Sequence, residues 1–232
     1  MLAGAWLVIY LDHITPPKSL SERAYQEIRR MIVRLDLVPG AVVREDELQA
    51  TLGLGRTPIR EALQRLERDQ LVTVVPRRGV FVSQLDIADL AVLYETRAVL
   101  EPYAMRLAAV RGTEHHWAEM AAALDPAGDG SSADELLAID RRCREIVWEA
   151  AGNRFVTGTL DMLYSHSDRL WHLYLGDVAD LHGMIAEHRE ILAALRAGDA
   201  EQAAALILTH MRHFDEQIRA AVRRRLDPPL AG

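Results

Sequence analysis

The sequence contains little cysteine and no apolar stretch long enough to cross a membrane. Its single cysteine, Cys143, excludes an internal disulfide framework, and the absence of a Cys-x-x-Cys pair excludes a zinc site of that kind. The apolar run from Ala3 to Leu11 is too short for a bilayer span and lacks the basic flank and cleavage site of a signal peptide. We therefore expect a cytoplasmic protein with no membrane partner, and we interpret residues 1–17 as an N-terminal extension.

Charge is distributed unevenly along the chain. The whole sequence carries a formal net charge of −7, but residues 18–83 contain twelve Lys/Arg against nine Asp/Glu, a balance of +3, which leaves −10 elsewhere. Only the potential close to DNA governs its attraction, so this split is expected when one domain approaches phosphates and the other does not. A chain of 232 residues can form two domains, which we place at residues 18–84 and 85–228.

The first domain is predicted to begin with three helices. Ser19 to Glu22 has the spacing of a capping box, and apolar residues recur behind it at helical intervals. A second helix is predicted over Glu45 to Leu52, followed by a glycine turn at residues 53–55. A third is predicted from Pro58, as its first helical residue, to about residue 70, with Thr57 as its cap. Three helices with a tight turn predict a helix-turn-helix.

The third helix is the one that we expect to enter a major groove. Its apolar residues form one face, which leaves Arg56, Arg60 and Gln64 pointing outward from its N-terminal half. We expect both arginines to make bidentate contacts to guanine edges or phosphates. Thr57 and the free amides at the helix start are expected to hold a phosphate. The predicted partner is double-stranded operator DNA.

A β-hairpin with a basic tip is predicted to follow. β-Branched runs at residues 72–75 and 80–82 are separated by Pro76-Arg77-Arg78-Gly79. We interpret this hairpin as the wing of a winged helix-turn-helix. Arg77, Arg78 and Gly79 at its tip are expected to meet the neighbouring DNA backbone or the minor groove.

These residues together resemble the GntR family of transcription regulators. The resemblance extends over about sixty residues and combines the turn, the arginine pair and the wing in order. It is carried by Leu54-Gly55-Arg56-Thr57-Pro58-Ile59-Arg60-Glu61-Ala62-Leu63, Leu66 and Pro76-Arg77-Arg78-Gly79-Val80-Phe81-Val82. Gly55 departs from the family, which usually has Ser or another small polar residue there, so one phosphate hydrogen bond is expected to be absent.

The second domain is predicted to be an antiparallel helical bundle. Beyond Gln84 the pattern is helical throughout, with a long helix that Asp86 caps and that ends before Gly112. Further helices are predicted over about residues 133–150, 155–175, 182–195 and 200–225. The predicted fold class is therefore mainly α, an N-terminal winged helix-turn-helix plus a C-terminal all-helical bundle.

The bundle resembles the FCD ligand-binding domain of the FadR subfamily. The resemblance is carried by the helix order together with Arg97-x-x-x-Glu101, Asp140, Gly152-Asn153, His188, and the Gly198-Asp199 break before His210. Members that are similar in these positions bind a divalent metal and sense mainly organic acids. The resemblance therefore implies Asp140, His188 and His210 as ligands of Zn²⁺ or Ni²⁺. Arg97 and Asn153 are candidates for the effector pocket, although Arg97 is equally suited to a surface pair with Glu101.

One of the family's metal ligands is replaced in this sequence. The family has a His four residues after the Asp, whereas position 144 is Arg, on the same helix face as Asp140. A guanidinium keeps its proton and cannot coordinate a metal. Two arrangements follow. Either Asp140, His188 and His210 hold the ion as a three-ligand site, or Arg144 replaces the metal, pairs with Asp140 and binds an effector carboxylate directly.

The predicted function is regulation of transcription by a homodimer. Each copy places its third helix in a major groove, and a small carboxylate effector changes the spacing of the two DNA-binding units through the linker at residues 84–86. The alternatives are a metal-dependent hydrolase built on Asp140, His188 and His210, and an architectural helical protein without a ligand. The sequence has no Ser-centred elbow and no phosphate-cradling glycine loop, so we expect no enzyme.

Overall fold

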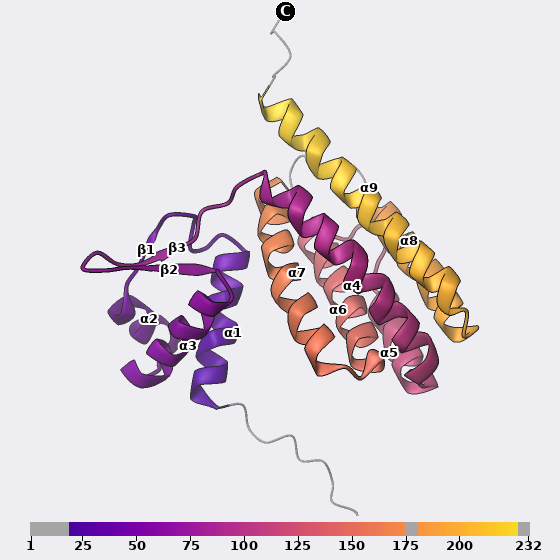
Figure 1. Cartoon of the computed structure of the whole chain (residues 1–232), viewed down its shortest axis with the longest axis horizontal. Coiled ribbons are helices and arrows are strands. Elements are labelled where there is room, and N and C mark those ends of the chain that lie inside the picture. The colour runs from indigo at the N-terminus through magenta and orange to yellow at the C-terminus, as the bar shows by residue number, and fades with distance from the viewer. Residues whose placement is uncertain (1–18, 175–180, 227–232) are drawn as a thin grey trace, which may run out of the picture.

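A computed structural model describes residues 19–174 and 181–226, so the predicted extension at residues 1–17 lies outside the described residues. The chain forms an N-terminal unit over residues 20–83, here called the head, and a helical bundle over residues 89–226 (Figure 1). Each unit contains its own cluster of buried apolar side chains. The predicted fold class is confirmed, because a small winged unit precedes an all-helical one.

The head contains three helices and a small sheet. Its elements are α1 (Leu20–Val33), β1 (Val42–Val43), α2 (Glu45–Leu52), α3 (Arg56–Arg68), β2 (Val72–Val75) and β3 (Gly79–Val82). Ser19 caps α1 as predicted, since its hydroxyl accepts a hydrogen bond from the amide of Glu22 at 3.1 Å. The strands pair antiparallel in the order β1-β3-β2. The sequence analysis missed β1, because a strand of two residues is too short to show a periodic pattern.

The third helix starts earlier than the sequence analysis predicted. α3 begins at Arg56, and Gly55 is its N-cap, without a side-chain hydrogen bond. The prediction that Thr57 caps the helix and that Pro58 is its first residue was therefore wrong. Pro58 is the third helical residue, which is still within the first turn, where a missing N–H removes no bond of the helix. The shift brings Arg56 into the helix, beside Arg60 on its outer face.

The bundle contains six helices within the described residues. They are α4 (Asp89–Arg111), α5 (Glu114–Leu124), α6 (Ala133–Ala151), α7 (Arg154–Tyr174), α8 (Leu181–Arg196) and α9 (Ala200–Leu226). The sequence analysis named no helix at α5. It also placed the start of α4 too early, because Asp86 accepts from the amide of Ala88 at 2.8 Å in the preceding turn. None of the described helices combines the length and apolarity that a bilayer span requires.

Aromatic side chains fill the core of the bundle between α6, α7 and α9. Trp148 and Trp171 are each 3 % exposed. The ring of Tyr164 meets both of them edge to face, and the ring centroids of Trp171 and Phe214 are 4.2 Å apart. Both tryptophans therefore pack the core of the bundle. Because the hydroxyl of Tyr164 points out of this apolar stack, it can reach a polar partner on α6.

Candidate functional site

The outer face of α3 carries the side chains that were predicted to meet DNA. Arg56, Thr57, Arg60 and Gln64 are all exposed. Nε of Arg60 donates to both carboxylate oxygens of Glu45 on α2, at 3.0 and 2.9 Å. Nε of Arg56 lies 4.0 Å from the same carboxylate. Glu45 thus holds the inner end of the Arg60 guanidinium and leaves its two terminal nitrogens for a partner. The sequence analysis did not assign this positioning role to Glu45.

The tip of the hairpin is held in a tight turn. The amide of Arg78 donates to the carbonyl of Val75 at 3.0 Å, and Arg77 has a positive φ of 63°. Gly79 has a φ of 108°, a conformation that residues with a side chain rarely adopt. Arg77, Arg78 and Gly79 are exposed. The structure therefore explains why glycine is needed in the turn, while the DNA contacts of these residues stay predictions.

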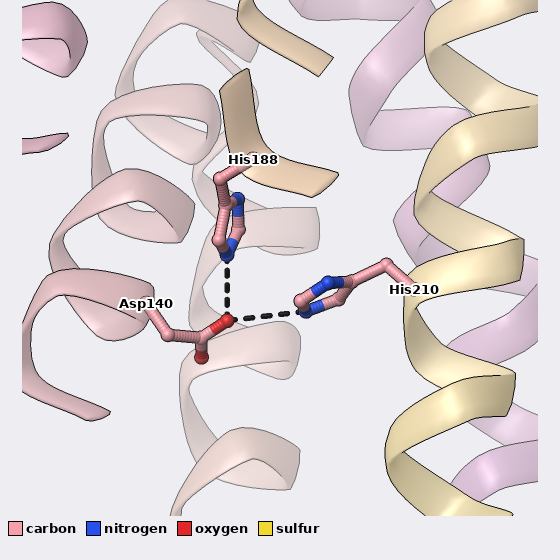
Figure 2. A group of neighbouring side chains, drawn as sticks. All are labelled: Asp140, His188 and His210. Atoms are coloured by element: carbon pink, nitrogen blue, oxygen red, sulfur yellow. Dashed lines mark hydrogen bonds and ion pairs between the residues drawn. The ribbon is translucent and has the colours of Figure 1, made fainter. Parts of the chain in front are cut away.

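In the bundle, Asp140 is the centre of a fully buried polar cluster. Its Oδ1 accepts from Nε2 of His188 at 2.6 Å and lies 3.1 Å from Nε2 of His210 (Figure 2). Its Oδ2 accepts from the Tyr164 hydroxyl at 2.5 Å and from Nε of Arg144 at 3.0 Å. The three residues predicted to hold a metal come from α6, α8 and α9, and their ligand atoms lie within 4.8 Å of one another. The structure thus brings this predicted set together.

A second carboxylate, that of Glu101 on α4, joins two guanidiniums beside this centre. Nη1 of Arg144 donates to its Oε2 at 2.5 Å. Nε and Nη2 of Arg97 donate to its Oε1 at 2.8 and 2.5 Å, and Nη1 of Arg97 donates to the hydroxyl of Ser167 at 3.0 Å. The alternative of a surface Arg97–Glu101 pair was wrong in one respect. The pair forms, but its side chains are only 7 % and 2 % exposed.

The protonation states in this cluster follow from burial and from the arginines. Burial alone would raise the pKa of Asp140, but the Arg144 guanidinium and the two histidines hold it well below its usual range. Burial would also raise the pKa of Glu101, but the Arg144 and Arg97 guanidiniums beside it lower that pKa by more, so it lies below its usual value. Burial lowers the pKa of His188 to about 4, so this ring is neutral near pH 7. Two buried carboxylates and two buried guanidiniums therefore balance one another.

The two histidines of the centre differ in what supports their second ring nitrogen. Nδ1 of His210 lies 2.8 Å from Oε2 of Glu187, whose other oxygen contacts His213. Nδ1 of His188 is buried and has no hydrogen-bond partner within the part of the chain described. An open groove of about 400 Å³ between α8 and α9 is lined by Glu187, His210 and His213, among others. His210 therefore belongs both to the buried centre and to the lining of this groove.

Two other features bear on the predicted effector pocket. Asn153 caps α7, since its Oδ1 accepts from the amides of Phe155 and Val156 at 3.2 and 3.4 Å, and this is the role that the structure gives it. A small cavity of about 20 Å³ is lined by both guanidiniums, by Ser167 and Asp215, and by apolar side chains. It holds about one water molecule. A ligand of any size therefore requires this cavity to widen.

A much larger cavity lies elsewhere, at the junction of head and bundle. It measures about 570 Å³ and is lined by residues of both units, including Ser83, Asp86, Val92 and His166. None of the residues predicted for the effector or the metal lines it. Its size alone therefore does not outweigh the chemistry gathered around Asp140.

Comparison with known proteins follows the same division into two units. The model for bacterial regulatory proteins of the gntR family matches residues 20–82, and the FCD domain model matches residues 92–213. An HTH-type transcriptional regulator in an unstable DNA locus of Streptomyces ambofaciens is 32 % identical over 212 residues, covering 84 % of this chain and 85 % of the relative. The Nta operon transcriptional regulator of Aminobacter aminovorans is 34 % identical over 199 residues, covering 83 % and 93 %.

Solved structures show the same fold. McbR/YncC of Escherichia coli superposes with a TM-score of 0.78 at 23 % sequence identity, covering 89 % of this chain and 99 % of that one. The family models and the relatives are transcription regulators, not enzymes, and they give no support to the hydrolase alternative.

Proposed function

We propose, from the premise that this chain belongs to the gntR family of bacterial regulatory proteins and is a transcription regulator with an FCD domain, that a small carboxylate effector controls its affinity for operator DNA. The helix-turn-helix implies DNA binding. We place this activity in the cytoplasm. The observation that carries the proposal is the pair of exposed arginines on α3, Arg56 and Arg60, which Glu45 orients from the neighbouring helix. An enzyme or an architectural protein has no use for this arrangement.

The chemistry of the bundle favours Arg144 over a resident metal as the cation at the centre. A carboxylate offers about four lone-pair sites, and four side chains already lie within hydrogen-bond distance of the Asp140 oxygens. The charges of Asp140 and Glu101 are balanced by Arg97 and Arg144, so a dication would leave two uncompensated positive charges in a buried site. The residues present therefore do not fit a resident metal ion. They fit a centre in which the guanidiniums of Arg97 and Arg144 supply the positive charge.

An effector carboxylate suits the guanidiniums of Arg97 and Arg144, which now clasp Glu101. Arginine forks bind carboxylates in a bidentate manner, and the apolar walls of the adjoining cavity suit a short carbon chain. Because that cavity holds about one water, the effector must widen it or displace Glu101. Effector binding is thereby coupled to a rearrangement of the bundle, which is what control over a distant DNA surface requires.

Metal analysis separates this arrangement from a three-ligand zinc or nickel site. The three-ligand metal site is the second candidate. It is favoured by the convergence of Asp140, His188 and His210, and by the contact of Glu187 with His210, because histidine ligands of metals commonly contact a carboxylate through their other ring nitrogen. We expect protein purified without chelator to carry less than about a tenth of an equivalent of either metal. Arg144→His restores the family's ligand set and should bind about one equivalent. Close to one equivalent in the wild type would assign the ion to the three-ligand set.

A second copy of the chain is the partner that the exposed face of α4 suits. Val92, Val99, Tyr103 and Val110 lie at helical intervals along this helix and are 61 %, 71 %, 47 % and 79 % exposed. An apolar stripe with spacings of seven and four residues is typical of helices that pair. Family regulators are typically dimeric. We therefore propose that two copies join along α4 and present two heads to a pseudo-palindromic operator.

The proposal is tested by binding to a duplex from the region upstream of the protein's own gene. We expect the affinity to fall by about a hundredfold or more between 50 and 200 mM salt, because phosphate contacts release counterions. Light scattering should give two chains per duplex. A panel of hydroxy- and dicarboxylic acids should contain members that raise the melting temperature of the wild type but not of Arg144→Met. Binding that is insensitive to salt, or absent from every such fragment, would remove the DNA part of the proposal.

A further inference from the structure

One helix of the bundle, α7, contacts the head on one face and the buried centre on another. It lies between α1 of the head and the rest of the bundle (Figure 1). Residues Asp161, Ser165, His166 and Arg169 contact the head. Tyr164 and Ser167, on the same helix, contact Asp140 and Arg97 at the centre. A change at the centre can therefore reach the head through a single rigid element.

The main contact with the head is the partly buried ion pair of Arg29 and Asp161. Arg29 lies on α1 and is 4 % exposed. Its Nη1 donates to Oδ2 of Asp161 at 2.8 Å, and its Nη2 donates to Oδ1 at 2.6 Å and to the backbone carbonyl at 3.0 Å. Its Nε donates to the hydroxyl of Ser165 at 2.8 Å. A bidentate pair of this kind, with the guanidinium buried, fixes orientation as well as distance.

Two further contacts of α7 with the head are weaker. Nε2 of His166 lies 2.8 Å from the backbone carbonyl of Asp69, and Nη2 of Arg169 donates to the carbonyl of Ser83 at 2.6 Å. Nε of Arg169 is buried without a hydrogen-bond partner in the described residues, and burial lowers the pKa of this side chain to about 10. A buried cation without a carboxylate opposes the docked state. The position of the head therefore depends strongly on the Arg29–Asp161 pair.

The same Asp161 is tied to the centre through Arg141 and Tyr164. Nη2 of Arg141, on α6, donates to Oδ1 of Asp161 at 3.0 Å. The Arg141 guanidinium lies 5.4 Å from the centre of the Tyr164 ring, within the range of a cation–π contact. The hydroxyl of Tyr164 donates to Asp140 at 2.5 Å. Continuous contacts therefore run from Asp140 through Tyr164, Arg141 and Asp161 to the head.

We propose that Asp161 is the positioning residue of the DNA-binding head, and that the hydrogen bond between Tyr164 and Asp140 sets how firmly it holds Arg29. An effector that rearranges the centre then acts on the head by loosening or tightening this ion pair. The action of an effector at the centre rests on the function proposed above. The coupling between the two ends is a property of the folded chain, so it can be measured without DNA or effector.

Amide hydrogen exchange in the full-length protein tests the coupling. Asp161→Asn removes the charge that holds Arg29 and should make α1 exchange about tenfold faster by allowing the head to open locally. Tyr164→Phe removes only one hydroxyl, at the far end of the route, and should speed exchange in α1 in the same direction. The matched control is Asp134→Asn, which breaks a second ion pair between the units. That pair, with Arg34, has both side chains about half exposed, and we expect α1 to exchange as in the wild type.

The double variant Tyr164→Phe/Asp161→Asn decides whether the two residues act in one series. If they do, the double variant should exchange in α1 no faster than Asp161→Asn alone. Effects that multiply as independent ones, or wild-type exchange of α1 in a folded Tyr164→Phe protein, would overturn the proposal. Arg141→Gln interrupts the same route at its middle and serves if Tyr164→Phe loses its near-ultraviolet circular dichroism. Absence of DNA binding would count against the proposed function and would leave this result unchanged.

Discussion

Arg60→Ala should weaken binding to the operator duplex by about 1–3 kcal/mol, which is roughly 5- to 150-fold, and should relax the preference at one base pair. The reason is the geometry at α3. Glu45 holds Nε of Arg60, so the terminal nitrogens face outward as a fork that matches the N7 and O6 atoms of guanine. The measurement is fluorescence anisotropy with the preferred duplex and with single-base variants at fixed salt concentration.

Two further variants show whether Arg60 reads a base or only adds charge. Arg196→Ala removes an arginine of the bundle that is 42 % exposed and paired with Glu114, away from α4, and it should leave the affinity for DNA unchanged. Glu45→Gln keeps the shape of the support but weakens its hold on Nε, so it should reduce discrimination more than affinity. If Arg60→Ala weakens binding equally to all duplexes, the residue contacts phosphate and reads no base.

Local patterns in the sequence were sufficient for most of the fold. Helix α2 has the predicted bounds, and the wing lies at the predicted residues, because caps, glycine turns and β-branched runs are local signals. The start of α3 was misplaced because Thr57-Pro58 looks like a cap followed by a first residue, whereas Gly55 serves as the cap. Helix α5 was not named, since its apolar face is short and follows a histidine pair. These errors concern element ends and short elements.

The candidate site was predictable only where residues lie on one helix or match a family pattern. The spacing of four residues placed Arg144 on the same helix face as Asp140, and the structure shows the pair that one of the two alternatives required. The contacts of Arg144 with Glu101 and of Asp140 with Tyr164 join residues 43 and 24 positions apart. The pair of Arg29 and Asp161 spans 132 positions. No period in a single sequence encodes such pairs, because they depend on how helices pack.

Arg144→Met should destabilise the protein by about 3–5 kcal/mol, because the buried carboxylates of Asp140 and Glu101 lose the cation that lies between them. Arg144 is 1 % exposed and donates to both Asp140 and Glu101. Methionine nearly fills the space, so the loss is mainly electrostatic rather than a cavity effect. Chemical unfolding of the full-length chain at pH 7 measures it. Arg196→Met breaks an exposed pair elsewhere in the bundle and should leave the unfolding midpoint where it is in the wild type.

The pH dependence identifies the cause of this loss. In the wild type the pKa values of Asp140 and Glu101 are lowered on folding, so their contribution to stability is present above about pH 4 and is lost as the pH falls through the folded values. Without Arg144, burial should raise the pKa of these carboxyls instead, so the variant should gain stability as they take up protons. The Arg144 guanidinium also helps to lower the pKa of His188, so its removal changes the contribution of His188 in the same direction. We therefore expect the difference in unfolding free energy to be largest near pH 7 and to shrink as the pH falls toward and below about 4, whereas a difference independent of pH would point to packing as its cause.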